Sequence, residues 1–162
     1  MTNPALNFSR EEYAARLNQT RKAMAKAEVE LFVVSDPSNM AWLTGYDGWS
    51  FYVHQAVVVT MTEDPLVWVR TQDMPGAWQT VWVSDENVVT YPEEHVQNPP
   101  HHPYETLCKH LADRGLSTAR IAVEMDNYYF SALCFEVLRR GLPQAKFADA
   151  QELVNWKRAV KS

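Results

Sequence analysis

The sequence has 162 residues, of which 46% are hydrophobic and 22% charged, a composition typical of one globular domain rather than of a disordered chain. The formal net charge is −5, and no basic stripe is available to neutralise phosphates, so nucleic acid is not an expected partner. The N-terminus lacks a basic segment followed by an apolar run, and no apolar stretch approaches the roughly 20 residues that span a bilayer. We therefore expect a cytoplasmic protein with no membrane partner.

The first third of the chain predicts a helix, a strand and a second helix. Ser9 and Glu12 form a capping-box pattern at the start of the first helix. The apolar residues that follow at helical spacing are Tyr13, Leu17, Met24 and Ala27. The run "VELFVVSD" is typical of a strand buried on both faces. Pro37 then begins a helix that Asp36 or Ser38 can cap and that Gly45 can end.

The middle third predicts a hairpin, a short helix, a strand and a long loop. The β-branched and aromatic runs at 51–61 and 66–71 indicate two antiparallel strands joined by a short turn. A short helix is expected within 73–83 and a strand at 87–92. The stretch "PEEHVQNPPHHPYE" holds four prolines and little apolar periodicity, so it predicts a loop.

The last third predicts three helices and one strand. The stripe of the first helix is Tyr104, Leu107, Cys108 and Leu111, with Gly115 after its end. A strand at 120–126 follows, and Asp126 or Asn127 begins a helix that Gly141 and Pro143 end. The inward positions of this helix are Phe130, Leu133, Cys134, Val137 and Leu138. A final helix within 148–162 has Leu153, Trp156 and Val160 at helical spacing.

Strands that alternate with helices predict an α/β layered domain, with a mixed β-sheet flanked by helices. The two cysteines, Cys108 and Cys134, both fall in apolar helical patterns, which is typical of small buried thiols. Their spacing leaves a disulfide open.

The common signatures of catalytic and cofactor sites are missing from the sequence. The five histidines form no H-E-x-x-H motif, and the cysteines do not lie two apart, so neither zinc signature is present. His101 and His102 fall in the proline-rich loop, where we expect solvated side chains rather than a ligand pair. None of the five glycines forms a phosphate-binding loop, and no G-x-S-x-G motif occurs. We expect no catalytic residue, metal or cofactor in this domain.

A binding function is better supported, by the run "GYDGWSFYVHQ" at 45–55. The aromatic residues within eleven positions are Trp42, Tyr46, Trp49, Phe51 and Tyr52. Aromatic faces attract cations by roughly 0.5–2 kcal/mol per contact, and a carboxylate adds charge selectivity. The run therefore predicts a site for a small cationic or zwitterionic molecule. The candidate substrate-binding residues are Asp47, Trp49, Phe51, Tyr52 and His54. The alternative is core packing, in which strand alternation sends Phe51 and Val53 to one face and Tyr52 and His54 to the other.

Several segments resemble the N-terminal domain of the creatinase/prolidase (Xaa-Pro aminopeptidase) family, over nearly the whole chain from about Phe8. They are "AMAKAEVELFVVSDPSNMAWLTGY", the hairpin that follows, "IAVEMD" and "ELVNWKRAVKS". The family opening D-P-S-N-x-x-[YW]-L-T-G-Y is matched by Asp36, Pro37, Ser38, Asn39, Trp42, Leu43, Thr44, Gly45 and Tyr46. The family ending [LVI]-x-x-x-[RK]-x-[VI]-K-S is matched by Val154, Arg158, Val160, Lys161 and Ser162.

The resemblance implies a ribonuclease H-like layered fold over 1–162. It also implies that 151–162 begins a linker helix to a pita-bread catalytic domain outside this sequence. Divalent metal ions, common in that domain, would lie outside this chain. Within the family, the run 45–55 is most similar to ectoine hydrolases, which open a cyclic amidine that carries a carboxylate.

In family dimers the N-terminal domain of one subunit covers the catalytic pocket of the other. The resemblance therefore implies a homodimer in which Trp49, Phe51, Tyr52 and His54 wall the pocket and Asp47 shapes the approach. The expected role is substrate shaping and dimerisation, with the isolated fragment inactive. The open alternatives are a Xaa-Pro dipeptidase or aminopeptidase, a creatinase, or a dimethylsulfoniopropionate lyase. An alternative of another class is a standalone small-molecule binding module.

Overall fold

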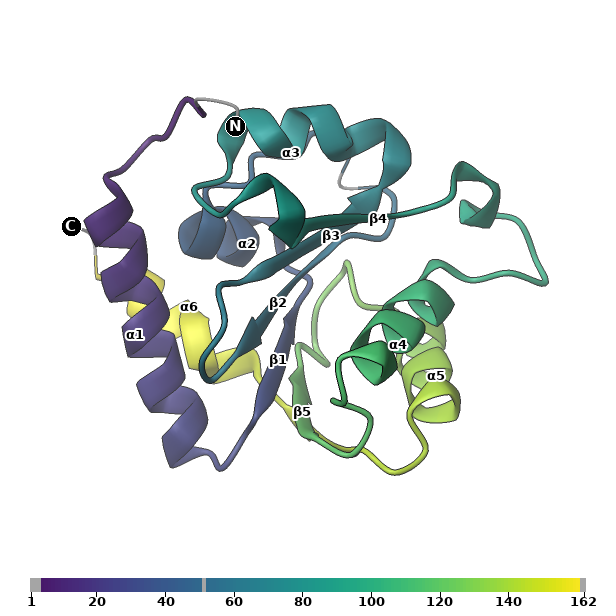
Figure 1. Ribbon diagram of the computed structural model, residues 1–162. Helices are drawn as coiled ribbons and strands as arrows, with labels where there is room; N and C mark the ends of the chain where they lie inside the picture. Colours follow the sequence, from purple (N-terminus) through teal and green to yellow (C-terminus); the bar gives the residue numbers. More distant parts are fainter. Residues whose placement is uncertain (1–3, 51, 161–162) are drawn as a thin grey trace.

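A computed structural model describes residues 4–50 and 52–160 of the chain. It shows a mixed sheet with helices on both faces, as the sequence predicts (Figure 1). The strands of this sheet are β1 Leu31–Val34, β2 Ala56–Thr60, β3 Leu66–Arg70, β4 Val88–Tyr91, β5 Arg120–Val123 and β6 Lys146–Asp149. The helices are α1 Arg10–Lys26, α2 Pro37–Thr44, α3 Met74–Thr80, α4 Pro103–Asp113, α5 Ala132–Gly141 and α6 Gln151–Ala159. Short 3₁₀ turns occupy Thr71–Asp73, Asp85–Asn87 and Glu93–His95.

The strand order is β4-β3-β2-β1-β5-β6, and one strand runs against the others. β2 pairs antiparallel with both β1 and β3, whereas the pairs β3–β4, β1–β5 and β5–β6 are parallel. The start of β2 therefore lies at the same sheet edge as the ends of β1, β3, β4 and β5. In open α/β sheets, ligands bind outside the carboxyl ends of the strands. The run 45–55 enters β2 at this edge.

The sheet separates two hydrophobic cores, because successive strand side chains point to opposite faces. On β1, Phe32 and Val34 pack in one core, and Leu31 and Val33 in the other. The first core also takes residues from α1, α2, α3 and α6, and the second takes residues from α4 and α5. Burying each such aliphatic side chain contributes roughly 1.5–3 kcal/mol. Cys108 and Cys134 lie in the second core as free thiols, as expected.

Local capping signals are confirmed. Ser9 caps α1 by accepting a hydrogen bond from the Glu12 backbone N–H, while the Glu12 carboxylate accepts one from Arg16 Nε. Asp36 caps α2 through the Ser38 and Asn39 backbone N–H groups. Gly45 ends α2 in the left-handed conformation.

Two predicted elements differ from the structure, and one strand was not predicted. β2 begins at Ala56, so the described residues 52–55 precede the strand and the expected strand alternation does not apply to them. α5 begins after Ser131, whose hydroxyl accepts from the Cys134 N–H, because Asn127 instead closes a turn with the Tyr129 N–H. β6 was not predicted, because an edge strand with mostly exposed side chains carries no apolar run.

Apolar spacing misplaced four side chains. Leu133, expected to face inward, is exposed in the first turn of α5, and Ala27 is exposed beyond the end of α1. On α6, Trp156 is exposed, as is Val160 just beyond the helix, and Val154 is the residue that enters the core. Helical spacing identifies a common face but does not say which face meets the sheet.

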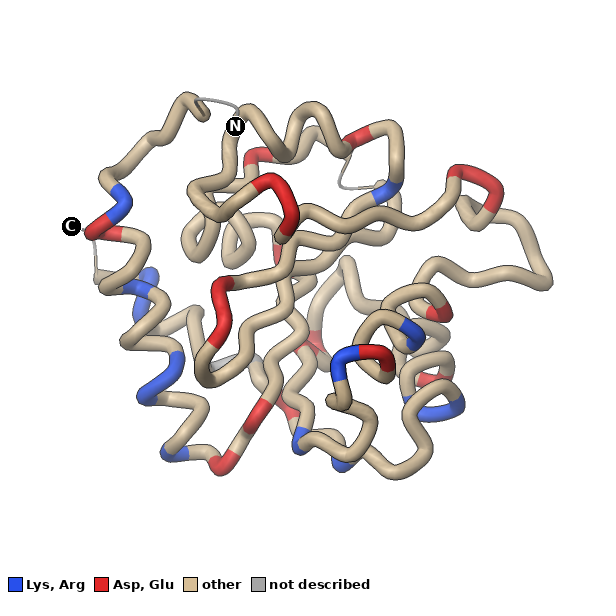
Figure 2. The backbone as a smooth tube through the Cα atoms, viewed as in Figure 1, with Lys and Arg blue, Asp and Glu red and all other residues tan. Residues whose placement is uncertain are grey.

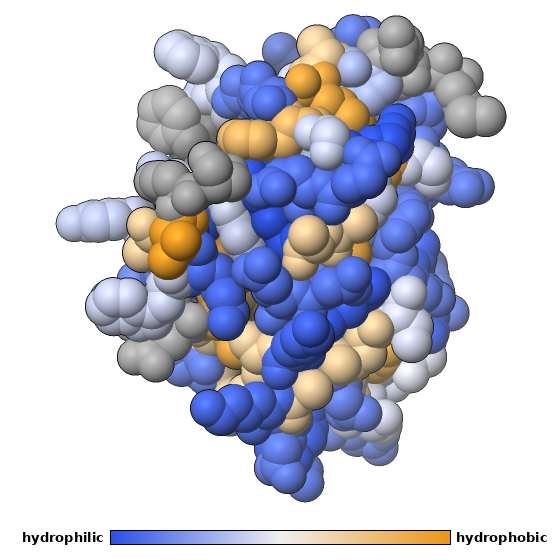
Figure 3. All heavy atoms as spheres, turned by 90° about the vertical axis from the view of Figure 1, so that its left-hand side faces the viewer, coloured by the Kyte–Doolittle hydropathy of each residue, from blue (hydrophilic) through white to orange (hydrophobic). Residues whose placement is uncertain are grey.

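Charged residues are spread over the surface, and basic ones recur along α1 (Figure 2). Three of them are engaged within the domain: Arg10 donates to the Trp82 carbonyl, Arg16 pairs with Glu12, and Arg21 donates to the Thr60 carbonyl. Seen from the side of α1, the surface is mainly hydrophilic, with small hydrophobic patches between the polar side chains (Figure 3). Among the described residues, no helix combines the length and the apolar character that a bilayer crossing requires.

Replacing Gly45 by alanine is expected to reduce the free energy of unfolding by about 2 to 3 kcal/mol. Its φ of +83° suits glycine, and an added Cβ would lie 2.6 Å from the Thr80 carbonyl oxygen. Gly115 is the matched control, since its φ is +75° but no atom lies within 4 Å of an added Cβ. Gly115→Ala should therefore lose only about 1 kcal/mol. Urea unfolding measures both, and equal losses would show that the Thr80 contact contributes nothing.

Candidate functional site

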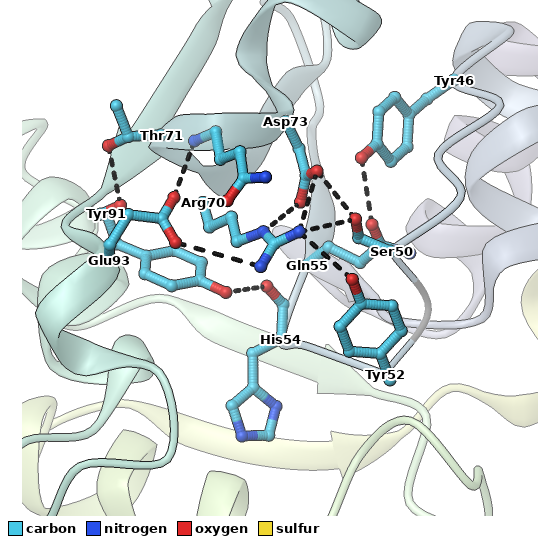
Figure 4. A network of polar contacts seen from close by, with 11 residues as sticks. Tyr46, Ser50, Tyr52, His54, Gln55, Arg70, Thr71, Asp73, Tyr91 and Glu93 are labelled. Carbon is cyan, nitrogen blue, oxygen red and sulfur yellow. Dashed lines mark hydrogen bonds and ion pairs between the residues drawn. The ribbon is translucent and has the colours of Figure 1, made fainter.

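The segment 45–55 connects α2 to β2. A buried hydrogen bond holds its two ends in place, and two of its aromatic rings face solvent. The Tyr46 hydroxyl donates to Gln55 Oε1 at 3.0 Å, closing the base of the loop from both ends (Figure 4). Both residues are buried, and burial raises the pKa of Tyr46. In contrast, the Trp49 side chain is 85% exposed and the Tyr52 side chain 60%. The core-packing alternative thus holds for Tyr46, whereas Trp49 and Tyr52 face outward.

A nearly buried ion pair fixes the centre of this loop. Arg70, at the end of β3, donates from Nε to Asp73 Oδ2 at 2.8 Å, and this hydrogen bond raises the pKa of Arg70. Ser50 donates its hydroxyl hydrogen to Asp73 Oδ1 at 2.7 Å. Arg70 Nη2 in turn donates to the Ser50 hydroxyl at 3.1 Å and to the Tyr52 hydroxyl at 3.4 Å. In Figure 4 the guanidinium group of Arg70 lies among these partners and Glu93. One arginine therefore positions two residues of the loop.

The end of the loop borders a cavity of about 330 Å³. The Tyr91 hydroxyl, from the end of β4, donates to the His54 carbonyl oxygen at 2.6 Å and so fixes the backbone there (Figure 4). The His54 ring lies 4.7 Å from the His102 ring, centroid to centroid. Burial, together with the His102 charge, lowers the pKa of His54 to about 4. The cavity has the size of a pocket for a small molecule.

The predicted site residues thus occupy different surroundings. Asp47 is exposed beside Trp49, and its backbone N–H lies 3.4 Å from the Thr80 hydroxyl that accepts from it. Tyr52 lies on both the exposed surface and the cavity wall. His54 is half-buried and lines the cavity. Phe51 lies outside the described residues.

Sequence reasoning missed the residues that hold the loop in place. Arg70 and Asp73 are three positions apart, a spacing that indicates an ion pair. Their partner Ser50 lies 23 positions before Asp73, so local spacing does not predict this contact. Glu124 was also missed. It follows β5, is 2% exposed, and accepts hydrogen bonds from the Ser35 and Asp36 backbone N–H groups at 2.6 and 2.7 Å. These hydrogen bonds connect the end of β5 to the start of α2, at the sheet edge where the run 45–55 also lies.

The strand order, the single reversed strand and the helices on both faces define a layered α/β domain with a six-stranded mixed sheet. Residues 16–160 match the family model of the creatinase/prolidase N-terminal domain. The chain therefore belongs to the creatinase/prolidase N-terminal domain family.

Relatives of known sequence and structure agree with this assignment. The chain is 51% identical, over 163 aligned residues, to the ectoine hydrolase of Halomonas elongata, covering 100% of this chain and 41% of that protein. It is 35% identical to an uncharacterised hydrolase/peptidase of Sinorhizobium fredii, covering 97% of this chain and 40% of that protein. The chain thus spans about two fifths of the length of these curated relatives.

Solved structures show the same fold at lower identity. A proline dipeptidase of Streptococcus pneumoniae superposes with a TM-score of 0.72 at 23% identity, covering 90% of this chain and 98% of the solved one. A Xaa-Pro dipeptidase of Bacillus anthracis also gives a TM-score of 0.72, at 11% identity, covering 93% of this chain and 37% of the solved one. The predicted family and fold are confirmed.

Proposed function

We propose that this domain shapes the substrate pocket of a hydrolase that opens the ring of ectoine. The observation that carries the proposal is the 51% identity to an ectoine hydrolase over the whole chain. The anchored loop supports it, because Arg70 holds the Tyr52 hydroxyl and the exposed ring of Trp49 lies in the same loop. Ectoine is a small zwitterion with a delocalised cation, and aromatic faces attract such a cation.

In this proposal the catalytic residues, and any divalent metal ions, belong to a further domain of the intact protein. The loop 45–55 forms one wall of the substrate pocket, which a second subunit completes in a homodimer. Trp49, Phe51 and Tyr52 contribute aromatic rings to this wall, and Asp47 contributes a carboxylate. His54 forms the part of the wall next to β2. The isolated domain then has no hydrolase activity. That this chain spans about two fifths of its curated relatives supports a further domain.

The proposal is tested on the intact protein by its choice of substrate. We expect hydrolysis of ectoine to an N-acetylated diaminobutyrate, detected by chromatography, and little hydrolysis of Xaa-Pro dipeptides. Activity on the dipeptides alone would instead support the second candidate, a Xaa-Pro dipeptidase, to which the solved structures point by fold. Activity on neither substrate would favour a binding module.

Replacing Trp49 by alanine is expected to lower kcat/KM for ectoine about tenfold, the equivalent of one lost cation–π contact of about 1.4 kcal/mol. Stability should change by less than about 0.5 kcal/mol, because the side chain is 85% exposed. Trp156→Ala is the matched control, since that tryptophan is also exposed but lies on α6. Equal kcat/KM in Trp49→Ala and the unmodified enzyme would remove this ring from the pocket.

A further inference from the structure

Three side chains from separate segments converge beside the cavity under the loop. They are His54 before β2, His102 before α4, and Cys134 in the first turn of α5. Each offers one ligand atom, and these atoms all lie within 4.8 Å of one another. Cys134 Sγ is 3.6 Å from His54 Nδ1. The fold thus brings two imidazoles and a thiol to one point.

The distances fit a tetrahedral metal ion. Zn²⁺ lies about 2.3 Å from a thiolate sulfur and about 2.0–2.1 Å from an imidazole nitrogen, so the two ligand atoms are about 3.5 Å apart. The observed separation of Cys134 Sγ and His54 Nδ1 is 3.6 Å. The widest pair, within 4.8 Å, must close by about 1 Å, which a small rotation of a histidine side chain provides.

We propose that His54, His102 and Cys134 bind one divalent transition-metal ion of the Zn²⁺ type. Two imidazoles and one thiolate are the donor set that selects such borderline-soft ions over Mg²⁺ or Ca²⁺. Two of the three ligands, His54 and His102, line the cavity together with His95 and His101, so we expect the fourth coordination position to face it. The position is therefore open to water or to a small molecule, as in metal sites with three protein ligands.

The surroundings of the three residues support metal binding. Burial disfavours the charged form of both histidines and lowers their pKa, and the neutral imidazole is the form that binds a metal. Burial raises the pKa of Cys134, which opposes thiolate formation, so metal binding must displace the thiol proton to solvent as the metal–sulfur bond forms. The Ser131 hydroxyl, 3.2 Å from Cys134 Sγ, can donate a hydrogen bond to the resulting thiolate.

A second, independent feature of the cavity is an unsatisfied histidine. Within the described residues, His95 Nδ1 is buried and makes no hydrogen bond. The His95 ring stacks on His101, with centroids 5.1 Å apart and planes at 13°. A buried polar atom without a partner in a native protein calls for a missing water, ion or ligand. His95 lines the same cavity as His54 and His102.

Metal binding changes the start of α4. His102 Nδ1 accepts a hydrogen bond from the Tyr104 backbone N–H at 3.2 Å, which caps the helix. A metal on Nδ1 displaces that N–H directly. A metal on Nε2 requires the ring proton to move to Nδ1, which also ends the hydrogen bond. The loss of one neutral hydrogen bond is small beside the gain from three metal–ligand bonds.

The test titrates Co²⁺, a spectroscopic substitute for Zn²⁺, into the reduced and metal-free chain. We expect one equivalent to produce a thiolate-to-cobalt charge-transfer band in the near ultraviolet and tetrahedral visible bands, which Zn²⁺ then abolishes. We also expect the Tyr104 amide resonance to shift on Zn²⁺ binding. A wild-type chain without the charge-transfer band, or with an unshifted Tyr104 amide, would overturn the proposal.

Three variants separate this site from adventitious binding. Cys134→Ser should lose the charge-transfer band, and His54→Gln should weaken Co²⁺ binding at least tenfold. Ser131→Ala, which removes the hydrogen bond to the thiolate, should weaken it by about ten- to hundredfold. Cys108→Ser is the matched control, because Cys108 is the other buried thiol and lies in α4 away from the two histidines. Far-UV circular dichroism checks that each variant folds. A band that survives Cys134→Ser, or that Cys108→Ser removes, would place the metal elsewhere.

The proposal runs against the expectation from sequence motifs, which predicted no metal in this domain and a solvated His101–His102 pair. Known zinc signatures place ligands close together along the chain. Here His54 and Cys134 are 80 positions apart, so the fold alone brings them together. The proposal does not depend on which substrate the intact protein hydrolyses.

Discussion

Replacing Glu124 by alanine is expected to lower the free energy of unfolding by about 3 to 5 kcal/mol, the largest effect of any single substitution considered. The carboxylate is almost fully buried and accepts from two backbone N–H groups, of Ser35 and Asp36, and from the Asn39 side chain. Alanine removes every acceptor at once. Each buried donor left without a partner loses about 1–3 kcal/mol.

The effect should extend beyond β5, because Asn39 also donates to Asn155 Oδ1 at 2.9 Å and so connects the carboxylate to α6. Urea unfolding at neutral pH gives the loss of stability from the shift in midpoint at constant slope. Glu124→Gln keeps one acceptor oxygen and should lose less than alanine does. Glu136→Ala, at an exposed ion pair on α5, should change stability by less than about 0.5 kcal/mol. If the free energy of unfolding of Glu124→Ala lay within about 1 kcal/mol of that of the unmodified protein, water would be replacing the carboxylate as the hydrogen-bond acceptor without loss of stability.

Replacing Arg70 by alanine is expected to lower the free energy of unfolding by about 3 kcal/mol and to release the loop 45–55. The side chains of Arg70 and Asp73 are 12% and 17% exposed, so the substitution leaves a carboxylate that is largely shielded from water without its cation. Ser50 and Tyr52 lose the same donor. Arg70→Lys keeps the charge but cannot reproduce the planar fork, so it should recover only part of the loss.

Limited proteolysis measures the release of the loop directly. Arg70→Ala should be cleaved within 45–55 under conditions in which the unmodified protein resists. Arg139→Ala is the matched control, because Arg139 forms an exposed ion pair with Glu136 on α5. Unchanged protection in Arg70→Ala would show that the contacts of Tyr46 and Tyr91 suffice to hold the loop.

The features that the sequence predicted well are those decided by neighbouring residues. The caps at Ser9 and Asp36 and the left-handed Gly45 depend on a side chain and the backbone within three positions. The central strands are buried on both faces, so their β-branched runs are unmistakable. β6 was missed because its strand conformation depends on pairing with β5 rather than on its own side chains.

The candidate site could be predicted only in part. The composition of 45–55 indicated a binding surface, but not that Tyr46 turns inward while Trp49 and Tyr52 turn outward. The high strand propensity of 51–55 favoured an extension of β2, whereas β2 begins only at Ala56 and the His54 carbonyl oxygen accepts a hydrogen bond from the Tyr91 hydroxyl. The convergence of His54 with Cys134 depends on contacts between distant segments, which local patterns do not contain.

The reversed strand β2 has a consequence for how this fold diversifies. Trp49 extends from a loop that Tyr46, Gln55 and Arg70 hold in place, so an exchange of this exposed ring leaves those hydrogen bonds intact. Mutation can thus change the exposed surface at this position while the chain continues to fold. The outward face of the segment and its stability can therefore evolve separately.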